Sequence, residues 1–112
     1  MELQSTRTRD TLLVRVEEDR IDAAVAIQFK DAMRELAATT AGRVTLDLGK
    51  VRFIDSSGLG AIVWVLKFLS PARELVLANL TPNVERVFKL TRMNEVFRIL
   101  PSAHDTADAD TV

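Results

Sequence analysis

Cysteine is absent from the 112 residues of this chain, and so are long apolar runs. Without cysteine the protein can form neither a disulfide framework nor a thiolate nucleophile. The longest uncharged apolar run, residues 59–66, is far shorter than a membrane span. The first ten residues contain no apolar segment of the kind found in a signal peptide. We therefore expect a cytoplasmic protein that does not insert into a membrane.

The chain also has no large excess of either charge, because its 15 lysines and arginines nearly balance its 16 aspartates and glutamates. Nucleic acids and anionic membranes require a clustered basic surface, so neither is expected as the main partner. The single histidine, His104, lies in a polar tail where we expect it to be solvated. The nearby Asp105, Asp108 and Asp110 lack the glycine and glutamate of a calcium loop. We predict no metal and no cofactor.

Two common catalytic motifs are missing as well. A nucleophile elbow needs glycine two residues before the serine, but Ile54 stands two residues before Ser56. The only histidine that could act as a base lies in the tail, which makes a serine-histidine-aspartate triad improbable. No phosphate-binding loop of the Gly-x-x-x-x-Gly-Lys-Ser/Thr type occurs. We predict no catalytic residues and no enzymatic activity.

Alternation of apolar and polar residues predicts several strands. Residues 11–16 alternate, and a turn near Arg9 and Asp10 would pair them with residues 2–8. Residues 43–48, RVTLDL, alternate cleanly, so this strand is expected to bury one face only. Residues 74–80 are almost continuously apolar and predict a more completely covered strand, and a short last strand is expected within VFRIL.

Apolar residues at helical spacing and capping residues predict three helices between these strands. Asp22 suits the N-cap of the first helix, because its carboxylate can accept from free backbone N–H groups, and Gly42 suits its terminator. A second helix is expected over residues 57–69. Thr81 is expected to cap the third, with Pro82 at its first position, where the missing N–H costs nothing.

Strands that alternate with helices indicate parallel crossover connections within one sheet. We therefore predict a single α/β domain over residues 1–112, with a mixed sheet of four to five strands and helices mainly on one face. Residues 104–112 have little to bury and are expected to form a polar tail.

The segment FIDSSGLGAIVWVL, residues 53–66, stands out because poor helix formers precede the most apolar run of the chain. We expect Val51 and Phe53 to point inward ahead of it. Gly60, Trp64 and Lys67 would project from another side of the helix, where Trp64 could anchor a partner unless a neighbouring helix covers it. The inward stripe is predicted to consist of Leu59, Ile62, Val63, Leu66 and Leu69.

Residues 55–58 support two interpretations. Asp55, Ser56 and Ser57 are good capping residues, and Gly58 permits close backbone approach, so the segment could simply start a helix. The same geometry would expose a serine hydroxyl on a rigid scaffold, where a phosphate could be added without unfolding the domain. The spacing alone does not separate these two interpretations.

A longer stretch resembles a known family. VTLDLGKVRFIDSSGLGAIVWVL is similar to the signature of the STAS domain, the family of bacterial anti-sigma factor antagonists, and the resemblance extends over about residues 8–103. It implies that a kinase-type anti-sigma factor phosphorylates Ser56, that the unphosphorylated protein binds this factor, and that a serine phosphatase resets the switch. The partner-binding residues that it and the helix pattern suggest are Asp22, Asp55, Ser57, Gly58, Gly60 and Trp64.

The chain departs from the family pattern at some positions. Asp19 stands where the family often has glycine, SPARE replaces a glycine-rich turn, and Arg92 stands where a glycine usually ends the third helix. The runner-up function is a STAS accessory subunit of a transport ATPase complex, in which Ser56 would be structural.

Overall fold

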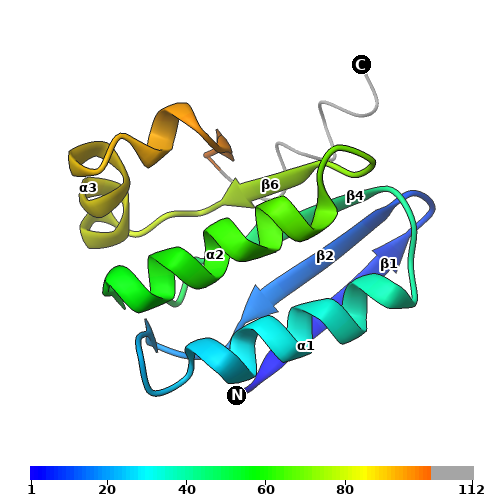
Figure 1. Cartoon of the computed structure of the whole chain (residues 1–112), viewed down its shortest axis with the longest axis horizontal. Coiled ribbons are helices and arrows are strands. Elements are labelled where there is room, and N and C mark those ends of the chain that lie inside the picture. The colour runs from blue at the N-terminus through cyan, green and yellow to red at the C-terminus, as the bar shows by residue number, and fades with distance from the viewer. Residues whose placement is uncertain (102–112) are drawn as a thin grey trace.

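The computed structural model describes residues 1–101 and folds them into two sheets, three α-helices and one short 3-10 helix (Figure 1). The predicted single α/β domain with a mixed sheet is confirmed. The tail with His104 lies outside the described residues. In chain order the elements are β1 (Leu3–Thr8), β2 (Thr11–Val16), β3 (Arg20–Ile21), α1 (Ala26–Ala38), β4 (Arg43–Asp47), β5 (Phe53–Ile54), α2 (Ser56–Leu69), β6 (Leu75–Ala78), α3 (Pro82–Leu90), η1 (Met93–Glu95) and β7 (Arg98–Leu100).

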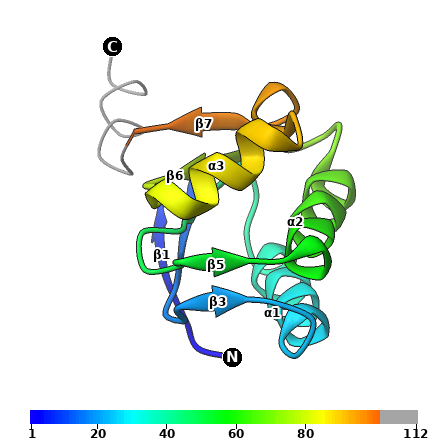
Figure 2. The same ribbon diagram turned by 90° about the vertical axis from the view of Figure 1, so that its left-hand side faces the viewer.

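The main sheet has the strand order β1-β2-β4-β6-β7. Only the β1–β2 pair is antiparallel, and it closes through the predicted turn, where Arg9 has a φ of 30°. The other neighbours are parallel, as crossover connections require. Helices α1 and α2 lie side by side on one face of this sheet (Figures 1 and 2). The prediction of helices mainly on one face is therefore confirmed for these two.

A second, two-stranded sheet lies at one end of the molecule. Its strands β3 and β5 are parallel and pair Arg20 with Phe53 and Ile21 with Ile54. Figure 2 shows this small sheet below α3, with β5 running directly into α2. It therefore brings the segment before α1 next to the segment before α2, which matters for the site described below.

Strand β4 buries both of its faces, so the prediction of one buried face was wrong. Thr45 and Asp47 are only 1% and 5% exposed although they point away from α1 and α2. Strand β4 is the central strand of the sheet, with β2 on one side and β6 on the other. Neighbouring strand residues in register with Thr45 and Asp47 shield them, and Arg15 Nε approaches Asp47 Oδ2 to 3.8 Å.

The boundaries of α1 differ from the prediction. The helix begins at Ala26, and Asp22 is not its N-cap, because the Asp22 carboxylate accepts a hydrogen bond from the Ala24 N–H in the turn before the helix. Gly42 does not end the helix either, since Thr39 is the C-cap. Gly42 has a φ of +87°, and a Cβ there would lie 2.1 Å from the Asp10 carbonyl oxygen. It shapes the turn into β4.

Phe53 was expected inside but is 46% exposed. Val51 is buried, as predicted, but residues 51 and 52 are not part of a strand, so the alternation is interrupted and Ile54 is buried in place of Phe53. Phe53 contacts Arg20, whose Cζ lies 5.1 Å from the ring centroid.

The buried stripe of α2 is also rotated relative to the prediction. Leu59, Val63 and Leu66 are only partly buried. A close approach of the helix to β3, described below, sets this orientation. The buried residues are Gly58, Ala61, Ile62, Val65 and Leu69.

The segment after β6, within the described residues, follows the expected pattern. Thr81 is the N-cap of α3 with Pro82 next, although the Thr81 hydroxyl donates to the Val51 carbonyl oxygen at 2.6 Å rather than capping the helix. Arg92 adopts a left-handed conformation with a φ of 60°. It therefore takes the backbone conformation that glycine provides most easily after a helix.

Candidate functional site

The site is organised by the carboxylate of Asp55, which is the N-cap of α2. Asp55 Oδ1 accepts a hydrogen bond from the Gly58 N–H at 2.8 Å, and Oδ2 accepts one from the Ala23 N–H at 3.1 Å. The first bond satisfies a free amide of the helix N-terminus. The second joins the start of α2 to the β3–α1 loop. One carboxylate therefore fixes two segments that are 32 residues apart.

These contacts also determine the ionisation of the site. The hydrogen bond from the Gly58 N–H holds the pKa of Asp55 below its ordinary value, with a further contribution from the Ala23 N–H. Both bonds stabilise the charged form, because they are donated to carboxylate oxygens. Asp55 therefore carries a full negative charge at neutral pH, at the positive end of the α2 dipole.

Asp22 occupies the corresponding position after β3. Its Oδ1 accepts from the Ala24 N–H at 3.1 Å, and its Oδ2 lies 3.7 Å from Arg20 Nη1. Because β3 and β5 are parallel and in register, both strands end at the same edge, and an aspartate follows each of them. The sequence predicted both acidic residues at the site but not the loop contact that joins them.

Ser56 and Ser57 are the first two residues of α2, and both are exposed. Neither hydroxyl makes a hydrogen bond to any residue within 1–101. The capping function belongs to Asp55 alone. The two serines are thus accessible groups on a helix terminus that is already capped.

The two glycines of the motif have different structural roles. Gly58 is buried, and a Cβ there would lie 2.0 Å from the Ile21 carbonyl oxygen, so only glycine allows α2 to pack this closely against β3. Gly60 is exposed, and a Cβ there would meet no atom within 4 Å. Gly60 leaves a flat backbone surface one turn beyond Ser56.

Trp64 lies further along α2 and is partly buried. Its ring stacks on Phe68 at 5.2 Å between centroids, and Lys30 Nζ from α1 lies 5.8 Å from its centroid. Eight residues of helix separate Trp64 from Ser56, about 12 Å along the axis. The structure therefore gathers the other predicted partner-binding residues at one end and places Trp64 on the flank of the helical layer.

The sequence patterns did not identify Arg20, Phe53 or Ile27 as candidate functional residues. Ile27 lies in the first turn of α1 and is 70% exposed, which is unusual for a large aliphatic side chain. The exposure of Phe53 follows from the shortness of β5. A strand of two residues does not extend the alternation of buried and exposed side chains to the residues beside it. Arg20 could be found only through the register of β3 with β5.

No helix within residues 1–101 is long and apolar enough to cross a membrane. Over the same residues, no cluster of three histidine or acidic side chains could hold a metal ion.

Comparisons with known proteins agree with this geometry. The chain is 31% identical over 101 residues to BtrV of Bordetella bronchiseptica, which is provisionally assigned as an anti-sigma factor antagonist, covering 89% of this chain and 87% of BtrV. It is 32% identical over 80 residues to the anti-sigma-B factor antagonist of Listeria monocytogenes, covering 70% of each protein.

Solved structures share the fold. An anti-sigma factor antagonist of Mycobacterium paratuberculosis superposes with a TM-score of 0.85 at 21% identity, over 96% of this chain and 92% of that one. The phosphorylated form of the Bacillus cell fate determinant SpoIIAA superposes with a TM-score of 0.68 at 19% identity, over 96% and 98%. At these identities the superpositions establish the fold alone. The model of the STAS domain matches residues 2–106, and the chain therefore belongs to the STAS domain family.

Proposed function

We propose that this protein is an anti-sigma factor antagonist that binds a kinase-type anti-sigma factor and is released when that kinase phosphorylates Ser56. One observation carries the proposal, namely an exposed serine next to a charged N-cap aspartate whose two oxygens are already engaged. The protein itself contributes no catalysis. The identities to BtrV and to the Listeria antagonist support this role over an unrelated use of the fold.

Phosphorylation of Ser56 would change the charge of the site but not the fold. A phosphoserine adds roughly −1.5 to −2 charges at neutral pH. Asp55 is ionised there, so the new charge meets an existing one. Because the Ser56 hydroxyl makes no hydrogen bond within residues 1–101, its modification breaks no contact that holds the domain together.

The added charge would directly weaken the contact with a docked partner. The surface around Ser56 includes Asp22, Ser57 and Gly60, and Gly60 has no side chain that would cover the backbone. Two added charges at the centre of such a contact cost desolvation and repulsion. A loss of about 2–4 kcal/mol, roughly 30- to 1000-fold in affinity, suffices to exchange partners. A serine phosphatase would restore the unphosphorylated, binding-competent form.

The test uses the anti-sigma kinase that co-purifies with the protein from its native host. Ser56→Ala should bind this kinase constitutively and resist labelling by ATP, whereas Ser56→Asp should bind at least tenfold more weakly. Ser57→Ala is the matched control and should still be labelled. Normal labelling of Ser56→Ala would show that the phosphorylated residue is another one.

The same purification tests the runner-up function. Recovery of a transporter ATPase in place of a kinase-like protein, with no phosphate on Ser56, would favour an accessory subunit without a phosphoswitch.

A further inference from the structure

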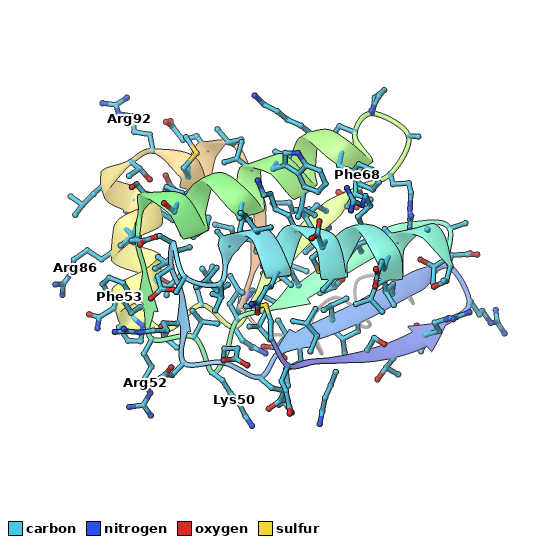
Figure 3. All side chains as sticks on the ribbon, turned by 60° about the horizontal axis from the view of Figure 1, so that its bottom comes forward. Lys50, Arg52, Phe53, Phe68, Arg86 and Arg92 are labelled. Carbon is cyan, nitrogen blue, oxygen red and sulfur yellow. The ribbon has the colours of Figure 1, made fainter. Side chains whose placement is uncertain are left out.

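A second surface with its own charge lies at the end of the molecule built from β5 and α3. Residues 49–54 and 82–92 carry five basic side chains and one acidic one, whereas the adjacent segment 17–22, which includes β3, carries four acidic side chains and one basic one. We call the surface formed by Arg52, Phe53, Arg86 and Leu90 the basic end face. Figure 3 places its labelled members Arg52, Phe53 and Arg86 at the same end of the molecule.

Most of the positive charge on these two segments is unpaired. Lys50 Nζ lies 2.6 Å from Glu17 Oε2, and Lys89 Nζ lies 3.2 Å from Glu85 Oε1. The guanidinium groups of Arg52, Arg86 and Arg92 form no ion pair or hydrogen bond with any residue of the described range 1–101. These three arginines are exposed and available to carboxylates from outside the chain.

Apolar side chains accompany the arginines. Leu90 is 78% exposed and lies one helical turn after Arg86, so the two share one stripe of α3. Phe53 is 46% exposed and is contacted by Arg20. Aromatic side chains and arginines are enriched at protein interfaces, and Leu90 adds exposed apolar area beside Arg86.

The basic end face is continuous with the surface around Ser56. Helix α3 packs against β5, and the Thr81 hydroxyl ties the start of α3 to the residue two before β5. Phe53 precedes Ser56 by three residues, a span of at most about 11 Å. Figure 2 shows β5 passing under α3 before it enters α2. A protein docked on the start of α2 can therefore reach Phe53 and α3 at the same time.

We propose that the basic end face is a second contact for the same anti-sigma factor, which would bring to it a segment with several carboxylates around an apolar side chain. The proposal rests on the proposed function, since it assigns the partner of Ser56 to this face. The unpaired arginines favour an acidic segment of the partner, because the charges are complementary. The exposed Leu90 and Phe53 favour an apolar side chain within that segment. A nucleic acid or membrane is disfavoured, because within the described residues 1–101 this face has only two unpaired arginines, Arg52 and Arg86, with exposed apolar groups beside them.

This second contact has a kinetic role. Charges at the edge of an interface accelerate association, and this effect depends on salt. The basic end face would hold the anti-sigma factor during the encounter, while Ser56 determines how long the complex lasts. Phosphorylation then acts on the contact at α2, and the contact at α3 stays unmodified.

Photo-crosslinking tests the location. p-Benzoyl-phenylalanine is placed in the full-length protein at Leu90 and, in a second variant, at Gly60, and both are irradiated in the native host. The proposal expects both positions to capture the same kinase-like protein, with an acid-rich peptide attached at position 90. Capture at 60 alone, or of nucleic acid or lipid at 90, would overturn the second contact and leave the proposed function standing. No kinase-like protein at either position would overturn both.

Association kinetics test the charge. The double variant Arg52→Glu, Arg86→Glu should bind the captured kinase with an association rate at least tenfold lower at low salt, and the difference should shrink as salt is raised. The matched control is Arg7→Glu, Arg9→Glu, which changes the net charge equally at exposed positions of β1 and the β1–β2 turn. Equal slowing in both double variants would assign the effect to net charge and contradict the proposed contact.

Discussion

The two ends of the layer formed by α1 and α2 are each held by one charged side chain, but the signs are opposite. At the N-terminal end the Asp55 carboxylate accepts from Gly58 and Ala23. At the C-terminal end the Arg73 guanidinium donates to the carbonyl oxygens of Gly42 and Ala37 at 2.7 and 2.8 Å, and to the Thr40 hydroxyl at 2.9 Å. Each charge complements the helix dipole at its own end.

The difference lies in what surrounds the two groups. All three nitrogens of the Arg73 guanidinium are used in contacts that tie α1 to the start of β4, and these contacts are partly buried. At the Asp55 end, the hydroxyl groups of Ser56 and Ser57 are exposed beside the capping carboxylate and make no hydrogen bond within residues 1–101. One end of the layer therefore uses its charged group entirely in internal contacts, while the other combines a cap with two exposed hydroxyl groups that form no hydrogen bond within residues 1–101.

The largest expected effect is a loss of stability when a methyl group is added at the close contact between α2 and β3. Gly58→Ala would place a methyl group 2.0 Å from the Ile21 carbonyl oxygen, which is backbone and cannot move aside cheaply. We expect a loss of at least about 3 kcal/mol in the free energy of unfolding, because such overpacking requires a shift of the helix. Urea denaturation measures it.

Gly60→Ala is the matched control for this prediction. It lies two residues further along the same helix, and its added methyl group meets open space. Alanine is the better helix former by roughly 0.5–1 kcal/mol, so this variant should be slightly more stable than the parent. Equal destabilisation by both substitutions would mean that the contact between Gly58 and Ile21 does not set the position of α2.

The next largest loss of stability is expected from a substitution at the opposite end of the layer formed by α1 and α2. Arg73→Met keeps much of the side-chain volume but leaves two backbone carbonyl oxygens without their donor. We expect a loss of about 2 kcal/mol, since partly buried acceptors would go unsatisfied. Arg34→Met removes an exposed pair with Asp31 at 3.0 Å and should change stability by less than about 0.5 kcal/mol. Thermal or urea unfolding that shows no difference between the two variants would contradict the stabilising role of Arg73.

The sequence predicted those parts of the fold that depend on local patterns. The hairpin of β1 and β2, the three helices and the parallel crossovers follow from alternation, helical spacing and caps. The same patterns singled out the segment from Asp55 to Gly60 as a candidate site, and the resemblance to the STAS domain favoured its functional interpretation. In each of these cases neighbouring residues in the chain determine the structure.

The predictions that failed depend on contacts between distant segments. The buried stripe of α2 is set by the approach of Gly58 to Ile21, and a hydrophobic pattern of one helix does not contain this information. Thr45 is buried although its position in the alternation is a polar one, and the alternation within one strand does not show whether its second face is covered. The bond between Asp55 and Ala23 needs the pairing of β3 with β5, two strands of two residues each. Such short strands leave almost no trace in a sequence.

A smaller effect, with a defined pH dependence, is expected at the Asp55 end. The pKa of Asp55 is lowered in the folded state, chiefly by the hydrogen bond from Gly58. The stabilisation is therefore present above the unfolded pKa and is lost as the pH falls through the lower folded pKa. Asp55→Asn should unfold at a lower temperature than the parent at pH 7, and the gap between the two should close below about pH 4. Calorimetry across this pH range measures it, and a gap that is constant with pH would show that the charge of Asp55 does not contribute.

The smallest effect on stability is expected at Ser56 itself. Ser56→Ala removes a hydroxyl that makes no hydrogen bond within residues 1–101, so the free energy of unfolding should change by less than about 0.5 kcal/mol. Ser57→Ala should behave in the same way, because Asp55 alone caps the helix. A loss above about 1.5 kcal/mol for Ser56→Ala would give this hydroxyl a structural role of the size expected for a helix cap. The difference between the two ends of the layer would then disappear, because modification of Ser56 could no longer be separated from unfolding.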